Sequence, residues 1–183
     1  MRRRFLLLAL PLAGCAATPT RQYTLSPVPG AVRAGVTARI GVRNVFIPGA
    51  LAASGLPAPA AAGQVVNAPN DLWAAPVAPM LQALMAQDLT QRLPAALVLD
   101  ENGAIGAPPD LYVEIQVYAF GPDETGLTTL IAQLAVRPAA TAATGWQVRS
   151  FSASAPGGST PDGLVAAMSA LWGQAADAVA AMV

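Results

Sequence analysis

The residue most clearly able to do chemistry is Cys15, the only cysteine in this chain of 183 residues. It follows three arginines at positions 2–4, an apolar run over residues 5–13 and the small residue Gly14. A basic segment, a short apolar segment and small residues before a cleavage point are the three parts of a secretory signal. The apolar run is far shorter than the roughly 20 residues that a membrane-spanning helix needs. We therefore predict that residues 1–14 are a cleaved signal peptide.

The four residues Leu12, Ala13, Gly14 and Cys15 resemble the bacterial lipobox. In lipoproteins of that kind the cysteine thiol is acylated, with palmitate among the acyl groups, and signal peptidase II then cuts just before the cysteine. Leu12, Ala13 and Gly14 would be the recognition residues, and Cys15 would become the lipidated N-terminus of a tether over residues 15–22. The alternative is that Cys15 is an incidental apolar residue of the signal peptide.

The basic segment carries a second signal. Residues 2–6 contain the RRxFL pattern of twin-arginine export, although three arginines also give an ordinary signal peptide its positive charge. The apolar run is very hydrophobic, and nothing in the chain suggests a cofactor that must be loaded before export. We therefore favour the general secretory route.

Composition narrows the range of partners and reactions. The chain has ten basic and ten acidic residues and no histidine, and every basic residue is an arginine. Loss of three arginines with the signal peptide leaves a mildly acidic domain, which argues against nucleic-acid binding because that needs a basic surface. Without histidine or lysine, the chain cannot build a Ser-His-Asp triad, a histidine metal site, a Schiff base or a P-loop. We therefore predict no catalytic residue, no metal site and no cofactor.

Carboxylates are the remaining groups that could do acid–base chemistry. Asp100-Glu101 and Asp123-Glu124 are adjacent pairs, but both fall in predicted turns, where solvated acidic side chains are common. Glu114 lies in the middle of a predicted strand, on its more polar side, where we expect it to be solvated or paired with an arginine. A carboxylate-only glycosidase fits these residue types, but the chain has few of the aromatic side chains on which sugars stack.

Hydrophobic periodicity predicts an α+β sandwich, with a mostly antiparallel or mixed sheet covered by two helices, in a single domain over residues 23–183. Strands are predicted over residues 23–25, 36–47, 97–99, 111–120, 127–137 and 146–153, and helices over residues 76–93 and from residue 161 onward. The last three strands, joined by short links, should form an antiparallel meander. Residues 48–71, rich in alanine, glycine and proline, should form a long loop with a short strand at 64–66.

The helix predicted over residues 76–93 has one apolar face. That face consists of residues at four-residue spacing, namely Leu81, Met85, Leu89 and Leu93. The polar residues Gln82, Gln87 and Arg92 are expected on the other sides of the helix.

Two tryptophans lie next to or within the helices. Trp73 stands in the sequence Trp73-Ala74-Ala75-Pro76, just before the first helix. It is expected either to pack beneath the helix start as a hydrophobic staple or to anchor a partner. Pro76 is tolerated at the helix start because the first turn has no intrahelical partner for its N–H groups. Trp172, on the last helix, is expected in the core.

Several short motifs, taken in order, resemble the ABC-type transport auxiliary lipoproteins, the PqiC-like group. These motifs are a Y-x-L at 23–25 soon after the lipobox, Ile40-Gly41-Val42 leading to Ile47-Pro48, a W-x-x-P at 73–76, leucines through 89, 93 and 97, and Arg149-x-Phe151 before an alanine-rich helix. The α/β fold of that family is compatible with the predicted sandwich. One departure is the stretch 49–63, which is mostly alanine, glycine and proline where family members often carry polar residues.

The resemblance implies a role in transport rather than a reaction. Such lipoproteins accompany an ABC permease, its ATPase and an MCE-domain protein that carries lipid between the two membranes of a Gram-negative envelope. The implied partners are that complex and the membrane that holds the lipid, with phospholipid and a second copy of the chain as further candidates. Ala16 stands where many inner-membrane lipoproteins have an aspartate, so the periplasmic face of the outer membrane is the expected location.

Two other functions fit the residues. A structural or assembly lipoprotein of the envelope, similar in architecture to TolB-N-like or secretion-apparatus domains, would have no transport role. A lipid-anchored carboxylate hydrolase would depend on Glu114, Asp123 and Glu124.

Overall fold

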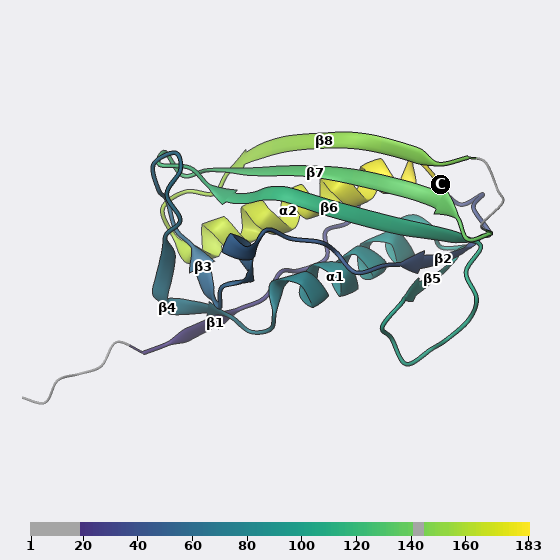
Figure 1. Cartoon of the computed structure of the whole chain (residues 1–183), viewed down its shortest axis with the longest axis horizontal. Coiled ribbons are helices and arrows are strands. Elements are labelled where there is room, and N and C mark those ends of the chain that lie inside the picture. Colours follow the sequence, from purple (N-terminus) through teal and green to yellow (C-terminus); the bar gives the residue numbers. More distant parts are fainter. Residues whose placement is uncertain (1–18, 141–144) are drawn as a thin grey trace, which may run out of the picture.

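The computed structural model describes residues 19–140 and 145–183, and the lipobox residues Leu12 to Cys15 lie outside the described residues. Figure 1 shows a long five-stranded sheet with both helices on one of its faces and a small three-stranded sheet at one end. The strands are β1 (Arg21–Tyr23), β2 (Arg39–Val42), β3 (Gly55–Pro57), β4 (Asn67–Trp73), β5 (Leu97–Asp100), β6 (Leu111–Pro122), β7 (Leu127–Pro138) and β8 (Gln147–Pro156). The helices are α1 (Val77–Arg92), α2 (Pro161–Ala180) and a short 3-10 helix η1 (Gly49–Ala52). This architecture confirms the predicted α+β class.

The five-stranded sheet has the strand order β5-β2-β6-β7-β8. β6, β7 and β8 form the predicted antiparallel meander, and β2 joins it in parallel with β6 on one side and β5 on the other. The β6–β7 ladder contains a bulge between Val117 and Ala119, so Tyr118 and Ala119 are both exposed and Phe120 returns to the buried side. The β7–β8 ladder stays in register along all ten residues of β8. β5 and β8 are therefore the two edges of this sheet.

The long loop predicted over residues 48–71 is wrong in detail, because this segment contains η1, β3 and most of β4. β4 pairs in parallel with β1 and antiparallel with β3, and residues 64–66, predicted as a strand, form part of the link between β3 and β4. The β4 sequence NAPNDLW contains residues that are rare in strands. β4 nevertheless forms a strand because it pairs with the distant β1, and an Arg21 Nε–Asp71 Oδ1 contact of 2.8 Å reinforces this pairing.

The strand predicted over residues 36–47 is also shorter in the structure, where β2 covers only Arg39–Val42. Beyond Val42 the chain stays attached to β6, through hydrogen bonds from Arg43 N–H to Val113 C=O and from Phe46 N–H to Ile115 C=O, both 3.0 Å long. It no longer pairs with β5, whose ladder with β2 ends at Val42↔Asp100. The loss of one neighbouring strand therefore explains why the regular strand ends early.

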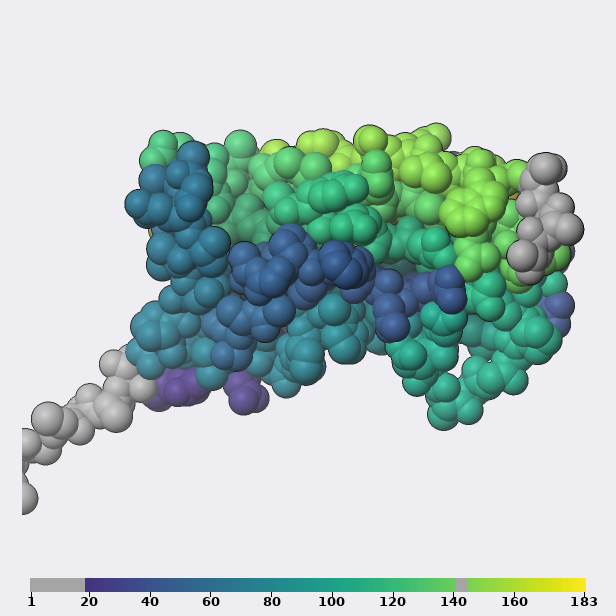
Figure 2. All heavy atoms as spheres, viewed as in Figure 1, coloured from purple at the N-terminus to yellow at the C-terminus, as the bar shows by residue number. Residues whose placement is uncertain are grey.

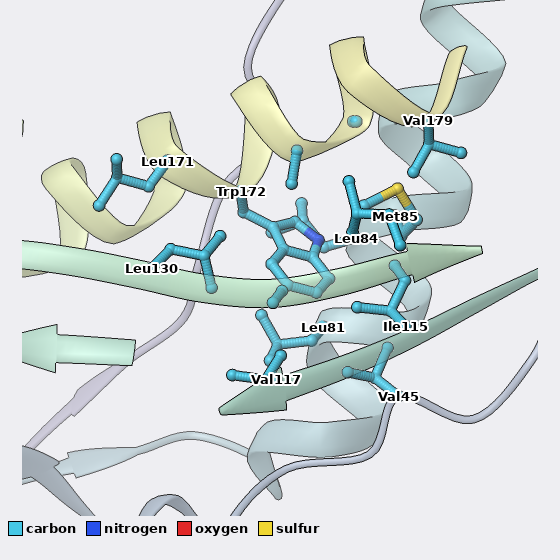
Figure 3. Close-up of a cluster of buried hydrophobic side chains, with 14 of the residues drawn as sticks. Val45, Leu81, Leu84, Met85, Ile115, Val117, Leu130, Leu171, Trp172 and Val179 are labelled. Atoms are coloured by element: carbon cyan, nitrogen blue, oxygen red, sulfur yellow. The ribbon is translucent and has the colours of Figure 1, made fainter. Parts of the chain in front are cut away.

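The hydrophobic core lies between the five-stranded sheet and the two helices. The apolar face predicted for α1 is confirmed, because Leu81, Met85, Leu89 and Leu93 are completely buried. Trp172 of α2 is completely buried too, as predicted, and its ring stacks on Phe120 with a centroid distance of 6.1 Å. Figure 3 shows the Trp172 ring between α2 and the strands, surrounded by side chains from β6, β7 and α1. This indole therefore joins all three parts of the core.

Polar residues of α1 depart from the sequence prediction, because Gln82 and Arg92 are buried rather than placed on open sides of the helix. Gln82 Nε2 donates to Val42 C=O at 3.0 Å and to Asp100 Oδ1 at 2.8 Å. At 100° per residue, Arg92 lies about 20° and Gln82 about 100° around the helix from Leu81. Both therefore fall within the arc from Leu81 to Leu93 that packs inward, and both are buried there with polar partners.

Arg92 and Asp88 fasten the chain that follows β1, residues 24–33, which we call the N-terminal strap. The Arg92 guanidinium donates to Val28 C=O at 3.0 Å, to Asp177 Oδ1 at 2.7 Å and to Gly173 C=O at 2.9 Å. The Val28 N–H donates to Asp88 Oδ1 at 3.0 Å. Burial raises the pKa of the Asp88 carboxyl, although the Val28 N–H and the Arg92 charge favour its ionised form. One buried cluster thus ties the strap to both helices.

Candidate partner-binding face

Exposed apolar side chains gather on the face of the five-stranded sheet that lies opposite the helices, which we call the outer face. Phe46, Tyr118, Ile131 and Val148 are 64%, 51%, 42% and 60% exposed. Figure 2 shows this face, with residues near position 45 (dark blue) lying in front of the green strands. A groove of about 500 Å³ lies along it, with Phe46 and Val148 among its lining residues. The outer face is therefore both apolar and hollowed, as protein-binding surfaces often are.

A cluster of arginine and glutamate side chains, the Arg–Glu cluster, lies beside this groove. Arg43 contacts Glu114 (Nη1–Oε1, 2.9 Å) and Glu101 (Nε–Oε1, 3.1 Å), and Arg137 contacts Glu114 (Nε–Oε1, 2.8 Å). Arg43 follows β2 and Glu101 follows β5. Glu114 lies on β6 and Arg137 on β7, so the strand order brings the four residues together. Partial burial disfavours the charge on Glu114, but hydrogen bonds from Arg43 and Arg137 outweigh it and hold the pKa of Glu114 below its usual value.

Two aromatic rings complete the cluster. The guanidinium carbons of Arg43 and Arg137 lie 4.8 Å and 4.6 Å from the centre of the Tyr112 ring. Arg137 also lies 5.3 Å from the centre of the Trp146 ring, and Trp146 is 60% exposed. Arginine held against aromatic rings is pre-organised for contact with another protein, and both residue types are enriched at the energetic centres of interfaces.

Of the carboxylates considered for catalysis, Glu101 and Glu114 are brought together by Arg43, whereas Asp123 and Glu124 lie at the β6–β7 turn. Glu114 is paired with arginines, as expected from its place on the strand. Asp123 caps the β6–β7 turn, where its Oδ1 accepts hydrogen bonds from the Thr125 hydroxyl and from the backbone N–H groups of Thr125 and Leu127. Those bonds, the Thr125 hydroxyl first, lower the pKa of Asp123. Among the described residues, no group of three or more histidine, cysteine, aspartate or glutamate side chains could hold a metal ion.

The sequence singled out two further positions, Trp73 and Pro76. Trp73 ends β4 and its side chain is buried in the core, while its backbone N–H donates to Ser54 C=O at 2.7 Å. Pro76 is exposed and precedes the first residue of α1. The burial of Trp73 favours the packing interpretation over a partner anchor. The exposed aromatic residues Phe46 and Trp146, which periodicity did not single out, lie on the outer face or at its margin instead.

Comparison with known proteins identifies the family of this chain and relatives of its fold. The family model described as the ABC-type transport auxiliary lipoprotein component matches residues 23–180. The chain belongs to this family. No curated protein sequence matches the auxiliary lipoprotein closely enough to count as a relative. No helix within the described ranges of the auxiliary lipoprotein is long and apolar enough to cross a membrane.

Solved structures share the fold of the auxiliary lipoprotein at low sequence identity. One, described as an uncharacterized protein, is 19% identical with a TM-score of 0.74, and the match covers 90% of this chain and 98% of that one. Another, a Xanthomonas campestris protein of the DUF330 family, is 14% identical with a TM-score of 0.67, covering 87% of this chain and 91% of that one. At these identities the likeness establishes the fold alone.

The Asp110→Asn variant of the auxiliary lipoprotein should lose a contribution to stability that depends on pH. The Arg39 side chain, and then its backbone N–H, donate to Asp110 and hold the pKa of this carboxyl at about 2, below its ordinary value of 3.8. A carboxyl with a lower pKa in the folded state stabilises the fold above its unfolded pKa, and this contribution is lost as the pH falls through the folded pKa. The wild type should therefore be more stable than the variant near neutral pH.

Urea unfolding at a series of pH values measures this effect. The difference in free energy of unfolding between the wild type and Asp110→Asn should stay constant from about pH 8 to 5 and shrink toward zero between about pH 4 and 2. Because the pair is exposed, the difference should also fall at high salt. A difference that grows on acidification would contradict the assigned role of Arg39.

Proposed function

We propose that this auxiliary lipoprotein is held at the periplasmic face of the outer membrane by lipid on Cys15 and docks other components of an envelope transport system. The docked partners are an MCE-domain protein and, through it, an ABC permease with its ATPase, and the transported molecule is a phospholipid. The observation that carries this proposal is the family match over residues 23–180, which associates the chain with an ABC-type transport system. The role is one of binding and position and requires no reaction.

The arrangement of the fold supports anchoring at one end. β1, the first described strand, lies with β4 at the end of the molecule that carries the small sheet (Figure 1). Beyond β1, the N-terminal strap is fastened to α1 and α2 by the Arg92 cluster. A lipid attached a few residues before β1 would therefore hold the folded domain directly, with little slack. Anchoring of this kind needs more than one acyl chain to be stable.

The outer face supports docking by protein contact. It combines exposed Phe46, Tyr118 and Ile131 with the Arg–Glu cluster and its aromatic rings. Interfaces take most of their binding energy from a few aromatic and arginine side chains surrounded by weaker contacts. The groove beside Phe46 and Val148 gives such a contact a shape to fill. We therefore place the main partner contact on the outer face.

Ile131→Glu should weaken association with the transport partners by about tenfold or more, because it places an uncompensated charge among the exposed apolar side chains of the proposed contact. Val32→Glu is the matched control, since Val32 is 64% exposed but lies on the N-terminal strap, which is fastened to the helices. The measurement is chemical crosslinking in intact cells, followed by purification of the tagged full-length protein and quantification of the MCE-domain protein and permease. Failure of the wild type to co-purify with any such component would count against the proposed function, and equal loss in both variants against the assignment of the outer face.

A further inference from the structure

The edge strand β8 carries a row of backbone N–H and C=O groups that form no hydrogen bond with any described segment. Gly157 N–H donates to Gly126 C=O at 3.0 Å, one step beyond the β7–β8 ladder. In an antiparallel ladder the hydrogen-bonded pairs alternate. Residues 149, 151, 153 and 155 therefore bond to β7, while the N–H and C=O groups of Val148, Ser150, Ser152 and Ser154 point away from the sheet. Among residues 19–140 and 145–183, no hydrogen bond reaches those outward groups.

β8 has only one of the devices by which edge strands normally avoid pairing, the charge of Arg149 on its helix-facing side, where Arg149 pairs with buried Leu134. Such strands are short, bulged, covered, or carry lysine, inward-pointing charge or proline within the strand. β8 has ten residues, so it is about 33 Å long, and its ladder has no register shift. Its one proline, Pro156, is its last residue, and its one charged residue is Arg149. The other edges are short, since β5 has four residues and β1 and β3 have three each.

Building on the function proposed above, we infer that β8 accepts an extended segment of the transport partner as an added strand. Strand addition supplies affinity through backbone hydrogen bonds and specificity through alternate side chains. The added strand would extend the outer face past Val148, so that both contacts belong to one continuous surface.

The side chains of β8 specify the chemistry of this segment. On the side that faces the helices, Phe151, Ala153 and Ala155 are only partly buried against the core, so the segment should present apolar residues there. Ser150 and Ser152, on the outer face, favour small or polar residues beside them. Arg149 is exposed and has no ion pair among the described residues, so an acidic residue should lie opposite it. The partner segment is therefore amphipathic with a period of two, and acidic at one end.

Ser152→Pro tests the inference at the backbone. Proline removes an outward N–H without removing a bond to β7, and proline is tolerated on a strand edge that faces solvent. Ser152→Ala keeps that N–H and is the matched control. With p-benzoylphenylalanine in place of Ser154 in the full-length protein in its native envelope, illumination should yield a crosslink to an extended segment of the MCE-domain protein, the partner proposed to dock directly. The yield should fall about tenfold or more in Ser152→Pro and stay within about twofold in Ser152→Ala.

Arg149→Glu provides a second test that does not alter the backbone, in case Ser152→Pro fails to fold. It should reduce the same crosslink, whereas Arg33→Glu should not, since Arg33 is equally exposed and likewise has no ion pair among the described residues. A crosslink to a second copy of this chain would overturn the inference in favour of self-association. No crosslink from position 154, with normal co-purification that Ile131→Glu still weakens, would overturn it and leave the proposed function standing. Absence of any co-purification in the wild type would remove the proposed function itself.

Discussion

Arg92→Ala lowers the free energy of unfolding by about 3–5 kcal/mol, the cost of removing one partner from a buried ion pair. The Arg92 side chain is 1% exposed and donates to three carbonyl groups, those of Val28, Asp88 and Gly173, and to the carboxylates of Asp88 and Asp177. Without it, Asp88 would keep a buried carboxyl with one N–H donor, and the C=O groups of Val28 and Gly173 would lose their partner. A charged group left unpaired in the interior is far more costly than the loss of an exposed contact.

Arg39→Ala is the matched control for this loss. Arg39 also contacts a carboxylate through two nitrogens, but both partners, Arg39 and Asp110, are nearly half exposed. Exposed pairs of this kind contribute little to stability, because solvent screens the two charges. Urea unfolding of the two purified full-length variants in detergent separates the predictions. Equal destabilisation by Arg92→Ala and Arg39→Ala would show that the buried cluster is not what fastens the strap.

The sequence predicted the packed face of α1 but not the burial of Arg92. The four-residue spacing of Leu81 and Leu89 correctly identified the face of α1 that meets the sheet. Arg92, eleven residues after Leu81, lies only about 20° from it around the helix, so it shares the packed face, although its charge alone favours solvent. Its burial arises from contacts with Asp177 and Val28, 85 and 64 residues away in the sequence. Periodicity identifies the packed face of a helix, whereas the polar partners that allow a charged residue to be buried on that face come from the tertiary arrangement.

The strands show the same limit. The alternating patterns of β6 and β7 are long and regular, and their meander was predicted correctly. β4 escaped prediction because Asn67, Asn70 and Asp71 disfavour strands locally, and because its neighbour β1 lies some fifty residues earlier. The candidate site was predicted only in part for the same reason, because some of its contacts are local and others depend on the order of the strands. Glu114 could be expected to find an arginine from its place on one strand, but Arg43 and Arg137 as its partners required the order of three strands.

Cys15→Ala should abolish maturation altogether. If Cys15 is acylated as proposed, the variant lacks the thiol that carries the lipid, and signal peptidase II has no modified residue before which to cut. We expect the precursor, with residues 1–14 still attached, to accumulate at the inner membrane. Intact mass of the purified protein and labelling with radioactive palmitate measure cleavage and acylation, and density-gradient separation of the two membranes measures location. Normal cleavage with release of a soluble periplasmic product would refute lipidation.

Ala16→Asp separates attachment from destination. The variant keeps Cys15, so it should be acylated and cleaved as the wild type is, but the aspartate should retain it at the inner membrane. Since the outer face and β8 are unchanged, the domain remains able to bind its partners, and only its membrane differs. Loss of transport in Ala16→Asp with normal acylation would therefore indicate that position in the outer membrane, and not lipidation alone, is required. An unchanged outer-membrane location would contradict the role assigned to position 16, while the test of Cys15 would stand.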